Sequence, residues 1–310
     1  MDAVLYILAR CALILLRTLP VRCVARLGRA GGELFYWIDV RHRRVALKNL
    51  KRCFGVEKPP AELRATAREN FRRIGENFAT AAKTATMSDA ELQPFFEVVG
   101  TEKIRRPPPD RKPQSCIVAI GHFGNFELFA RGARWVPALQ PATTYRGLRQ
   151  PSLNRLLQSL RERSGCLFFE RRTEAGALRT ALNQTGLLLG LLADQHAGDR
   201  GLRIHFLGHE CSTSAAPALF ALRYQCALHT AICYRIGLAR WRVEVGDEIP
   251  THELDKPRSI EAITRDMNRA FETAVLRDPA NWFWVHNRWK LPKQGTARPG
   301  RKPRVAHHVP

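Results

Sequence analysis

Apolar and polar positions divide the chain into a helical first third and a longer region of short alternating segments. Residues 40–54, VRHRRVALKNLKRCF, place Val45, Leu47 and Leu50 among cations. Residues 60–85 begin at a proline and repeat apolar residues at helical spacing. Because apolar residues three or four positions apart share one face of a helix, the pattern predicts two amphipathic helices here.

The pattern changes after PPPD (107–110), which is typical of a loop. Compact or alternating apolar runs predict strands at 115–120, 141–146, 166–170, 186–194, 228–236 and 240–249. Stretches with helical spacing predict helices at 124–136, 151–165, 174–184, 215–226 and 259–279. Strands that alternate with helices indicate an α/β fold, with a mixed, largely parallel central sheet flanked by helices.

The first 27 residues are apolar but interrupted by Arg10, Arg17, Arg22 and Arg26. The longest uncharged run is shorter than the roughly 20 residues of a membrane-spanning helix. Arg10 and Arg17 are seven positions apart, so a helix would place both on one face and the apolar residues on the other. We expect an amphipathic, membrane-associating helix or tilted anchor at 1–27. A cleaved signal peptide is the alternative, but no clear small-x-small site follows.

Composition adds charge to this picture. The chain has 310 residues, 45% of them hydrophobic, which excludes a disordered protein. Fifty Lys and Arg against 28 Asp and Glu give a net charge of +22. Such a surface favours an anionic partner: nucleic acid, acidic lipid, a phosphorylated substrate or an acidic carrier protein. The alternative is a basic surface that serves only solubility. Residues 28–292 are expected to be the folded domain, and 293–310, rich in Pro, Gly and cations, a disordered basic tail.

The eight cysteines are scattered, and none forms a CxxC pair. Most lie among apolar residues, where a thiol behaves as a small hydrophobic group. We expect them to be reduced and structural, as on a cytosolic face. No pair has the spacing of zinc ligands, so no metal is expected.

The stretch AIGHFGNFELFA places the titratable groups His122 and Glu127 directly after a predicted buried strand. A carboxylate that accepts a proton from one imidazole nitrogen fixes the tautomer, and the other nitrogen is then a free base. Gly124 and Asn125 lie between them, where backbone and substrate can come close and N–H groups can bind an anion. The alternative is a core histidine with a helix-capping acid.

Four further residues are candidates for substrate binding. Arg146 ends a predicted strand and can hold a phosphate through two N–H groups. Arg171 and Arg172 follow the predicted strand CLFFE, and one of them is expected to face the site. Asp194 ends the apolar run GLLLGLLA, where a carboxylate is costly unless it is paired, so it should pair with an arginine or organise the site. The alternatives are surface arginines and a turn-forming acid.

Seven segments, in order along the chain, resemble the late acyltransferases of lipid A biosynthesis, the lauroyl and myristoyl transferases. The segments are RRVALKNLKRCF (43–54), ARENFRRIGEN (67–77), GHFGNFE (121–127), YRGLRQPSLNRLLQSLRERSG (145–165), LLLGLLADQHAG (187–198), STSAAPALFALRYQCAL (212–228) and NWFWVHNRWK (281–290). The resemblance extends from about residue 5 to 292. Two positions depart from it: His196, where glycine or an acid is usual, and Asn287, where arginine is usual.

The resemblance implies an acyltransferase in which His122 is the general base and Glu127 orients it. The acyl donor would be a thioester on acyl carrier protein, and the acceptor an anionic lipid A precursor at the cytoplasmic face of an inner membrane. No cofactor is implied. The residues agree in one respect: no serine or cysteine occupies a nucleophile elbow, so a covalent acyl-enzyme is not favoured.

Three alternatives remain. A related O-acyltransferase could act on another lipid, such as a phosphatidylinositol mannoside. A basic nucleic-acid-binding protein would explain the charge but not the apolar N-terminus, and no zinc finger, helix-turn-helix or RNP-like motif is present. A membrane scaffold without activity is disfavoured because His122 and Glu127 are both present. We therefore expect no nucleic-acid partner.

Overall fold

The computed structural model describes residues 2–104, 114–136, 138–184, 186–199 and 201–290. The expected loop at 107–110 and the expected tail at 293–310 lie outside these residues.

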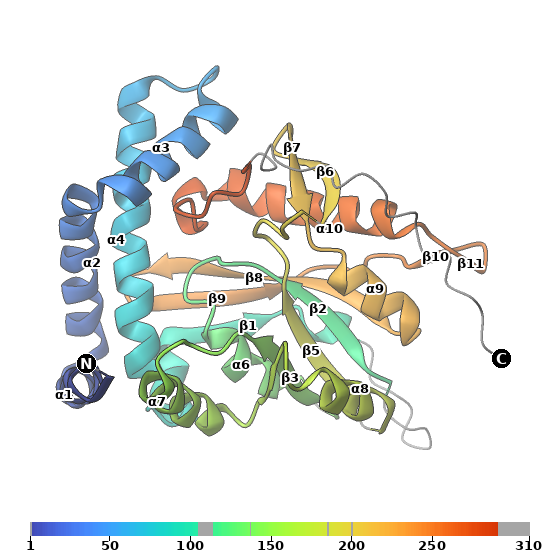
Figure 1. The fold of residues 1–310 in the computed structure, drawn as a ribbon, viewed down its shortest axis with the longest axis horizontal. Coiled ribbons are helices and arrows are strands. Elements are labelled where there is room, and N and C mark those ends of the chain that lie inside the picture. Colours follow the sequence, from blue (N-terminus) through green and yellow to red (C-terminus); the bar gives the residue numbers. More distant parts are fainter. Residues whose placement is uncertain (1, 105–113, 137, 185, 200, 291–310) are drawn as a thin grey trace, which may run out of the picture.

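Four helices lie together on one side of the molecule, and we call them the helical column (Figure 1, dark to light blue). They are α1 (Asp2–Thr18), α2 (Val21–Ile38), α3 (Val40–Phe54) and α4 (Pro60–Thr84). The helices predicted at 40–54 and 60–85 are thus confirmed as α3 and α4. Pro20 separates α1 from α2, because proline cannot continue a helix. The segment expected to be one anchor, 1–27, therefore divides between two helices. In the described residues no helix has both the length and the apolar character needed to cross a membrane.

Beside the column lies a seven-stranded sheet of order β1-β9-β8-β2-β5-β3-β4, counted over the described residues (Figure 1). Its strands are β1 (Phe96–Val99), β2 (Cys116–Ile120), β3 (Gln140–Tyr145), β4 (Leu167–Glu170), β5 (Leu187–Leu192), β8 (Ala227–Gly237) and β9 (Arg240–Val245). The five strands from β8 to β4 are parallel, whereas β9 runs antiparallel to β8. The predicted fold class, a largely parallel central sheet flanked by helices, is confirmed. The edge strand β1 was not predicted.

The remaining helices and small hairpins complete the fold. The helices are α5 (Asp89–Leu92), α6 (Leu128–Gly132), α7 (Pro151–Arg161), α8 (Ala175–Gln184), α9 (Ala216–Arg223) and α10 (Ile260–Arg277). Two hairpins absent from the sequence prediction are β6 (Leu202–Phe206) with β7 (His209–Thr213), and β10 (His252–Glu253) with β11 (Lys256–Pro257).

The helix predicted at 124–136 is confirmed only from Leu128 onward: α6 continues into a 3-10 helix at Ala133–Trp135, whereas the residues before α6 form bends and turns. Gly124 has φ +50°, outside the range of a right-handed helix. A Cβ atom there would lie 2.5 Å from the carbonyl oxygen of Cys233, so the backbone passes close to β8. This contact delays the helix until Leu128.

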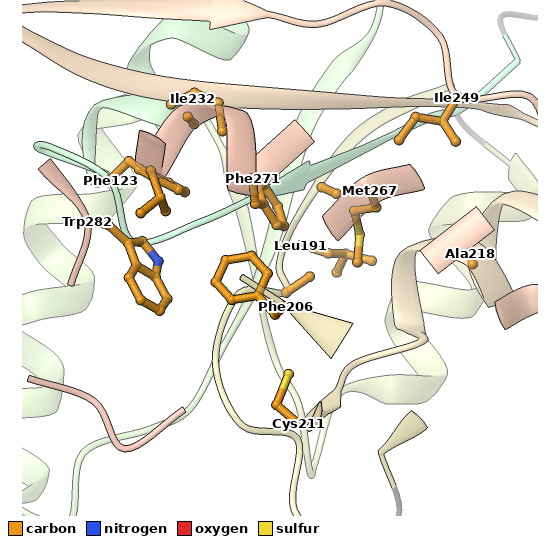
Figure 2. Packing of buried hydrophobic residues seen from close by; sticks show 14 of the residues in the cluster. Phe123, Leu191, Phe206, Cys211, Ala218, Ile232, Ile249, Met267, Phe271 and Trp282 are labelled. Carbon is orange, nitrogen blue, oxygen red and sulfur yellow. The ribbon is translucent and has the colours of Figure 1, made fainter. Parts of the chain in front are cut away.

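The sheet is buried on both faces. In β2, Ile117 and Ala119 pack into one hydrophobic cluster, whereas Val118 and Ile120 pack into another. A strand covered on both sides needs apolar residues at every position, which explains the continuous run CIVAI. Figure 2 shows part of the first cluster, where Phe206, Phe271 and Trp282 gather with residues of α9, α10 and the sheet. Five of the cysteines are buried, and burial raises the pKa of Cys226 to about 12, so that thiol stays protonated.

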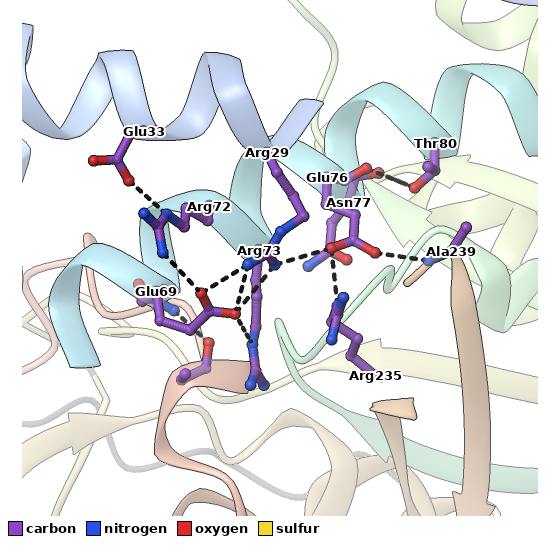
Figure 3. A network of polar contacts seen from close by, with 12 residues as sticks. Arg29, Glu33, Glu69, Arg72, Arg73, Glu76, Asn77, Thr80, Arg235 and Ala239 are labelled. Atoms are coloured by element: carbon purple, nitrogen blue, oxygen red, sulfur yellow. Dashed lines mark hydrogen bonds and ion pairs between the residues drawn. The ribbon is translucent and has the colours of Figure 1, made fainter. Parts of the chain in front are cut away.

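The helical column is joined to the sheet by buried charges (Figure 3). Glu76 of α4 is fully buried, and one of its oxygens, Oε2, accepts from Arg29 of α2 at 3.3 Å and from Arg235 of β8 at 2.8 Å. The other oxygen accepts from the backbone N–H of Ala239 at 2.9 Å. A buried carboxylate with three donors is stable only when all are in place, so this network fixes α2, α4 and β8 in one arrangement.

Candidate active site

The site forms where two neighbouring parallel strands end. β2 pairs with β5, with Ile120 opposite Leu192, and the N–H of Ala193 donates to the oxygen of Ile120 at 3.0 Å. His122 follows β2 and Asp194 follows β5. Because the carboxyl ends of parallel strands share one edge of the sheet, the two side chains meet there.

Asp194 holds the ring of His122. Its Oδ1 lies 2.8 Å from Nδ1 of His122, and its Oδ2 accepts from the backbone N–H of His122 at 2.9 Å. The indole N–H of Trp282 donates to the same Oδ2, also at 2.9 Å. The carboxylate is 1% exposed. It is therefore buried with a full set of donors, which is the condition for keeping a charge in the interior.

The electrostatics of this pair select one form of the imidazole. Burial by itself would raise the pKa of Asp194, but the attraction and hydrogen bonds of His122, together with the Trp282 donor, outweigh it and lower that pKa to about 2. An ionised Asp194 accepts the proton on Nδ1, so the lone pair of the neutral ring is on Nε2. No side chain or backbone group of the described residues is hydrogen-bonded to Nε2. The arrangement is that of a general base with an orienting carboxylate.

Glu127 does not take this orienting position. Its carboxylate pairs with Arg161 of α7, with Oε1 2.7 Å from Nη2 and Oε2 3.3 Å from Nε. The expectation that Glu127 contacts the ring of His122 is wrong, because the residues from 121 to 127 form turns rather than an opening helical turn. Arg161 itself lies over the rings of Tyr145 and Phe168, 5.8 and 5.3 Å from their centroids. The two acids of this region thus serve different partners.

Aromatic side chains lie beside the ring of His122. Its ring centroid is 4.9 Å from that of Phe126 and 5.8 Å from that of Phe283. Phe78 of α4 contacts both phenylalanines and is 54% exposed. His122, Gly124 and these three phenylalanines line one pocket, together with residues of α4 and of the segment 280–283. The phenylalanines form an apolar wall beside the base. The pocket itself is small, about 10 Å³, so it gives access to the base but does not hold a hydrocarbon chain.

Gly124 and Asn125, both expected to contact substrate, differ in position. Gly124 lines the pocket. Asn125 is 1% exposed, and its side-chain amide donates to Thr80 of α4 at 3.4 Å. It is not among the residues that line the pocket. The expectation for Asn125 is wrong in this respect, because the turn at Gly124 directs its side chain into the core against α4.

The three arginines proposed from the sequence lie outside this pocket. Arg146 follows β3, and Arg171 and Arg172 follow β4; all three are exposed. In the sheet order β3 and β4 are two and three strands from β2, which is about 10 and 14 Å at the usual strand spacing. They remain candidates for the distant part of an extended anionic substrate.

All residues of this site belong to a stretch of the chain that matches one known family. Residues 2–291 match the model of the bacterial lipid A biosynthesis acyltransferases. The chain belongs to this family. Among curated relatives, the lipid A biosynthesis palmitoleoyltransferase of Escherichia coli K12 is 24% identical over 279 residues, covering 87% of this chain and 85% of the relative. The lauroyltransferase of the same organism is 23% identical over 285 residues, covering 89% and 88%. A lipid A biosynthesis acyltransferase of Haemophilus influenzae is 23% identical over 279 residues, covering 88% and 86%. The protein is therefore an acyltransferase of lipid A biosynthesis, and the nucleic-acid-binding alternative loses its support.

The segment NWFWVHNRWK (281–290) of this acyltransferase packs beside Asp194. Trp282, Trp284 and Trp289 are each at most 5% exposed, so they serve packing rather than contact with lipid. Arg288 is fully buried and donates to Gln195 and Ser212 carbonyl oxygens and to Thr213 Oγ1, which fixes the turn after Asp194.

His286 of the acyltransferase is a poor alternative base. Its Nε2 accepts from the backbone N–H of His196 at 3.1 Å, so that lone pair is occupied. Burial lowers the pKa of His286 to about 4. Both observations agree with the choice of His122.

Two residues of the acyltransferase that contact the acids of the site were not candidates from the sequence. Arg161 lies within the helix predicted at 151–165, and Trp282 within the segment NWFWVHNRWK (281–290). Their partners are 34 and 88 positions away, so no local pattern marks either contact. The helical column helps to place Trp282: the amide of Asn70 in α4 donates to the carbonyl oxygens of Ala280 and Trp282.

Proposed function

We propose that this acyltransferase moves a fatty acyl chain from acyl carrier protein to a hydroxyl of a lipid A precursor, at the cytoplasmic face of the inner membrane. His122 is the general base in this proposal. The observation that carries it is the hydrogen bond from Nδ1 of His122 to the buried Asp194, which leaves Nε2 free at the pocket.

The proton moves through one imidazole. Nε2 of His122 takes the proton of the acceptor hydroxyl as its oxygen attacks the thioester carbonyl. The charge of the resulting imidazolium is stabilised by Asp194. As the tetrahedral intermediate collapses, the carbon–sulfur bond breaks and the imidazolium returns the proton to the leaving thiolate. The residues that line the pocket include no serine or cysteine, which supports direct transfer without an acyl-enzyme.

Glu127 is assigned to Arg161 rather than to His122. The carboxylate holds the guanidinium through two contacts, and both side chains are partly exposed, 30% for Glu127 and 17% for Arg161. A guanidinium fixed in this way presents its other N–H groups to an anion such as a phosphate. We propose that Glu127 positions Arg161 for an anionic group of donor or acceptor, with Arg146, Arg171 and Arg172 reaching more distant phosphates.

Membrane location is supported by the exposed apolar residues of the first helix. In α1, Ile7, Leu8, Ile14 and Leu15 are between 55% and 61% exposed. Burial of such side chains in a bilayer is favourable. We propose residues 1–27 as the membrane anchor, 28–292 as the acyltransferase domain and 293–310 as a basic tail. The net charge of +22 suits both an acidic carrier protein and a phosphorylated glycolipid.

The test is mass spectrometry of lipid A from cells that lack this protein and are complemented with wild type, His122→Ala or His252→Ala. Wild type and the His252→Ala control, which changes an exposed histidine, should add one fatty acyl unit. His122→Ala should not, because turnover falls by about 10²–10⁴-fold without a general base. Normal acylation by His122→Ala would end the proposed mechanism. Acylation of another lipid only would change the acceptor.

A further inference from the structure

The outer face of α2 is apolar and unusually exposed. Leu34 and Ile38 come seven and eleven positions after Leu27, so the three side chains lie on one side of the helix. They are 57% (Leu27), 57% (Leu34) and 67% (Ile38) exposed. Phe35 and Trp37, beside them, are 62% and 58% exposed. We call these five residues the outer face of α2. Large side chains this exposed and this close together mark an interaction surface rather than ordinary surface scatter.

The opposite side of α2 is locked against α4, so the outer face cannot turn inward. A Cβ atom on Gly28 would lie 2.5 Å from the carbonyl oxygen of Gly75. A Cβ on Gly32 would lie 2.1 Å from that of Phe71. Only glycine permits this approach of two helices. Arg29 adds its ion pairs to Glu69 and Glu76 (Figure 3). The apolar side chains are therefore presented permanently, on a rigid support.

The helix α2 lies at the periphery of the molecule, where a planar partner can reach it (Figure 1). In Figure 1, α2 runs along the left edge of the molecule, and α1 is seen end-on at its lower end. The helix α1, which directly precedes α2, adds further exposed leucines and isoleucines.

Cations border the apolar residues. Arg22 and Arg26 are exposed on α2, and Arg41, Arg44 and Lys48 are exposed on α3, which begins two residues after α2 ends. Trp37 donates to Glu33 and lies 5.8 Å below the guanidinium of Arg68. An indole between apolar side chains and charged groups is the arrangement found at the boundary of a bilayer. Cations beside it select an anionic surface.

We propose that the outer face of α2 is a second membrane contact, which lies flat in the headgroup region of an anionic bilayer. Attachment is then shared between α1 and α2 and does not depend on α1 alone. This inference rests on the membrane location proposed above. Contact through α2 fixes the orientation of the active site relative to the membrane. The reason is that α2 packs rigidly on one side of α4, and the other side of α4 lines the pocket.

The test compares two full-length double variants in co-sedimentation with phosphatidylcholine vesicles that contain phosphatidylglycerol. Leu34→Glu/Ile38→Glu changes the outer face. Leu219→Glu/Leu254→Glu makes the same change of charge at exposed leucines of α9 and the β10–β11 turn, at the opposite side of the molecule (Figure 1). The first should bind vesicles at least about tenfold more weakly than wild type, since two apolar side chains that the bilayer would bury become charged. The second should bind like wild type. Equal binding by both variants would overturn the inference.

Two controls distinguish membrane contact from a catalytic defect and from self-association. Acyl transfer in detergent micelles should be unchanged in Leu34→Glu/Ile38→Glu; loss of activity in wild type itself would instead count against the proposed function. If wild type is a dimer that this variant dissociates while vesicle binding is kept, the outer face contacts a second copy and the inference is wrong.

Fluorescence gives a second, local measurement. Trp37 and Trp135, 58% and 38% exposed, are the two tryptophans that are not buried. Brominated lipids should quench part of the wild-type emission, and Trp37→Phe should remove most of that quenching while Trp135→Phe should not. Undiminished quenching in Trp37→Phe would contradict insertion of the outer face.

Discussion

Two acidic residues lie near the base, and they differ in burial. Asp194 is 1% exposed and accepts from His122 twice and from Trp282 once. The Glu127 side chain is 30% exposed and pairs with one residue, Arg161. A buried carboxylate cannot lose a donor without leaving an unpaired charge, whereas a partly exposed pair exchanges its partner for water or substrate at little cost. The first pair therefore suits the tuning of a base, and the second suits the binding of a changing ligand.

Replacement of Asp194 by asparagine tests the buried pair and should have the larger effect. The amide cannot stabilise an imidazolium, and one of its donors would face His122 or Trp282. We expect turnover to fall by about 10²–10³-fold, within the range for general-base catalysis. Steady-state kinetics with acyl carrier protein thioester measures it. A loss smaller than that of Glu127→Gln would reverse the assignment of the two acids.

The pH dependence of stability gives a second view of Asp194. Its pKa in the folded protein is lowered to about 2, below the value of about 3.9 in an unfolded chain. The ionised form therefore adds stability above pH 4, and this contribution is lost as pH falls toward 2. In urea unfolding, the difference in free energy between wild type and Asp194→Asn should narrow over that range. A free-energy difference that stays constant between pH 4 and pH 2 would show that ionised Asp194 is not the source of the added stability.

Changes to the exposed pair should act on binding. Glu127→Gln and Arg161→Gln should each lower kcat/KM by about 10- to 100-fold, mostly through KM, because a charged hydrogen bond to substrate contributes about 1.5–3 kcal/mol. The double variant should lose little more than either single one if the two act as a unit. Thermal stability should change little, as for other exposed ion pairs. Additive losses would show that Glu127 acts without Arg161.

The smallest effect is expected for Trp282→Phe. It keeps an aromatic ring in the core but removes one of the three donors to Asp194. We expect turnover to fall about 3- to 10-fold, the value of one hydrogen bond, and the pH profile of kcat to move. An unchanged profile together with lower stability would mean that Trp282 only packs the core.

Much of the fold follows from local patterns in the chain. Helical spacing located α3, α4 and α10, and compact apolar runs located β2 and β5 within one or two residues. The same patterns placed His122 and Asp194 at the ends of buried strands, which is where parallel sheets place their sites. The edge strand β1 and the two short hairpins were missed. The strands of the hairpins have no compact apolar run like that of β2 or β5.

The sequence by itself determined the elements, the basic surface and the presence of a base and several acids, because these depend on residue type and on near neighbours. Only the tertiary structure decided which acid serves the base. Asp194 is 72 positions from His122, and Glu127 is five, yet β5 lies beside β2 and a tight turn directs Glu127 toward α7. Strand order is set by the burial of a whole sheet, and no local spacing contains that information.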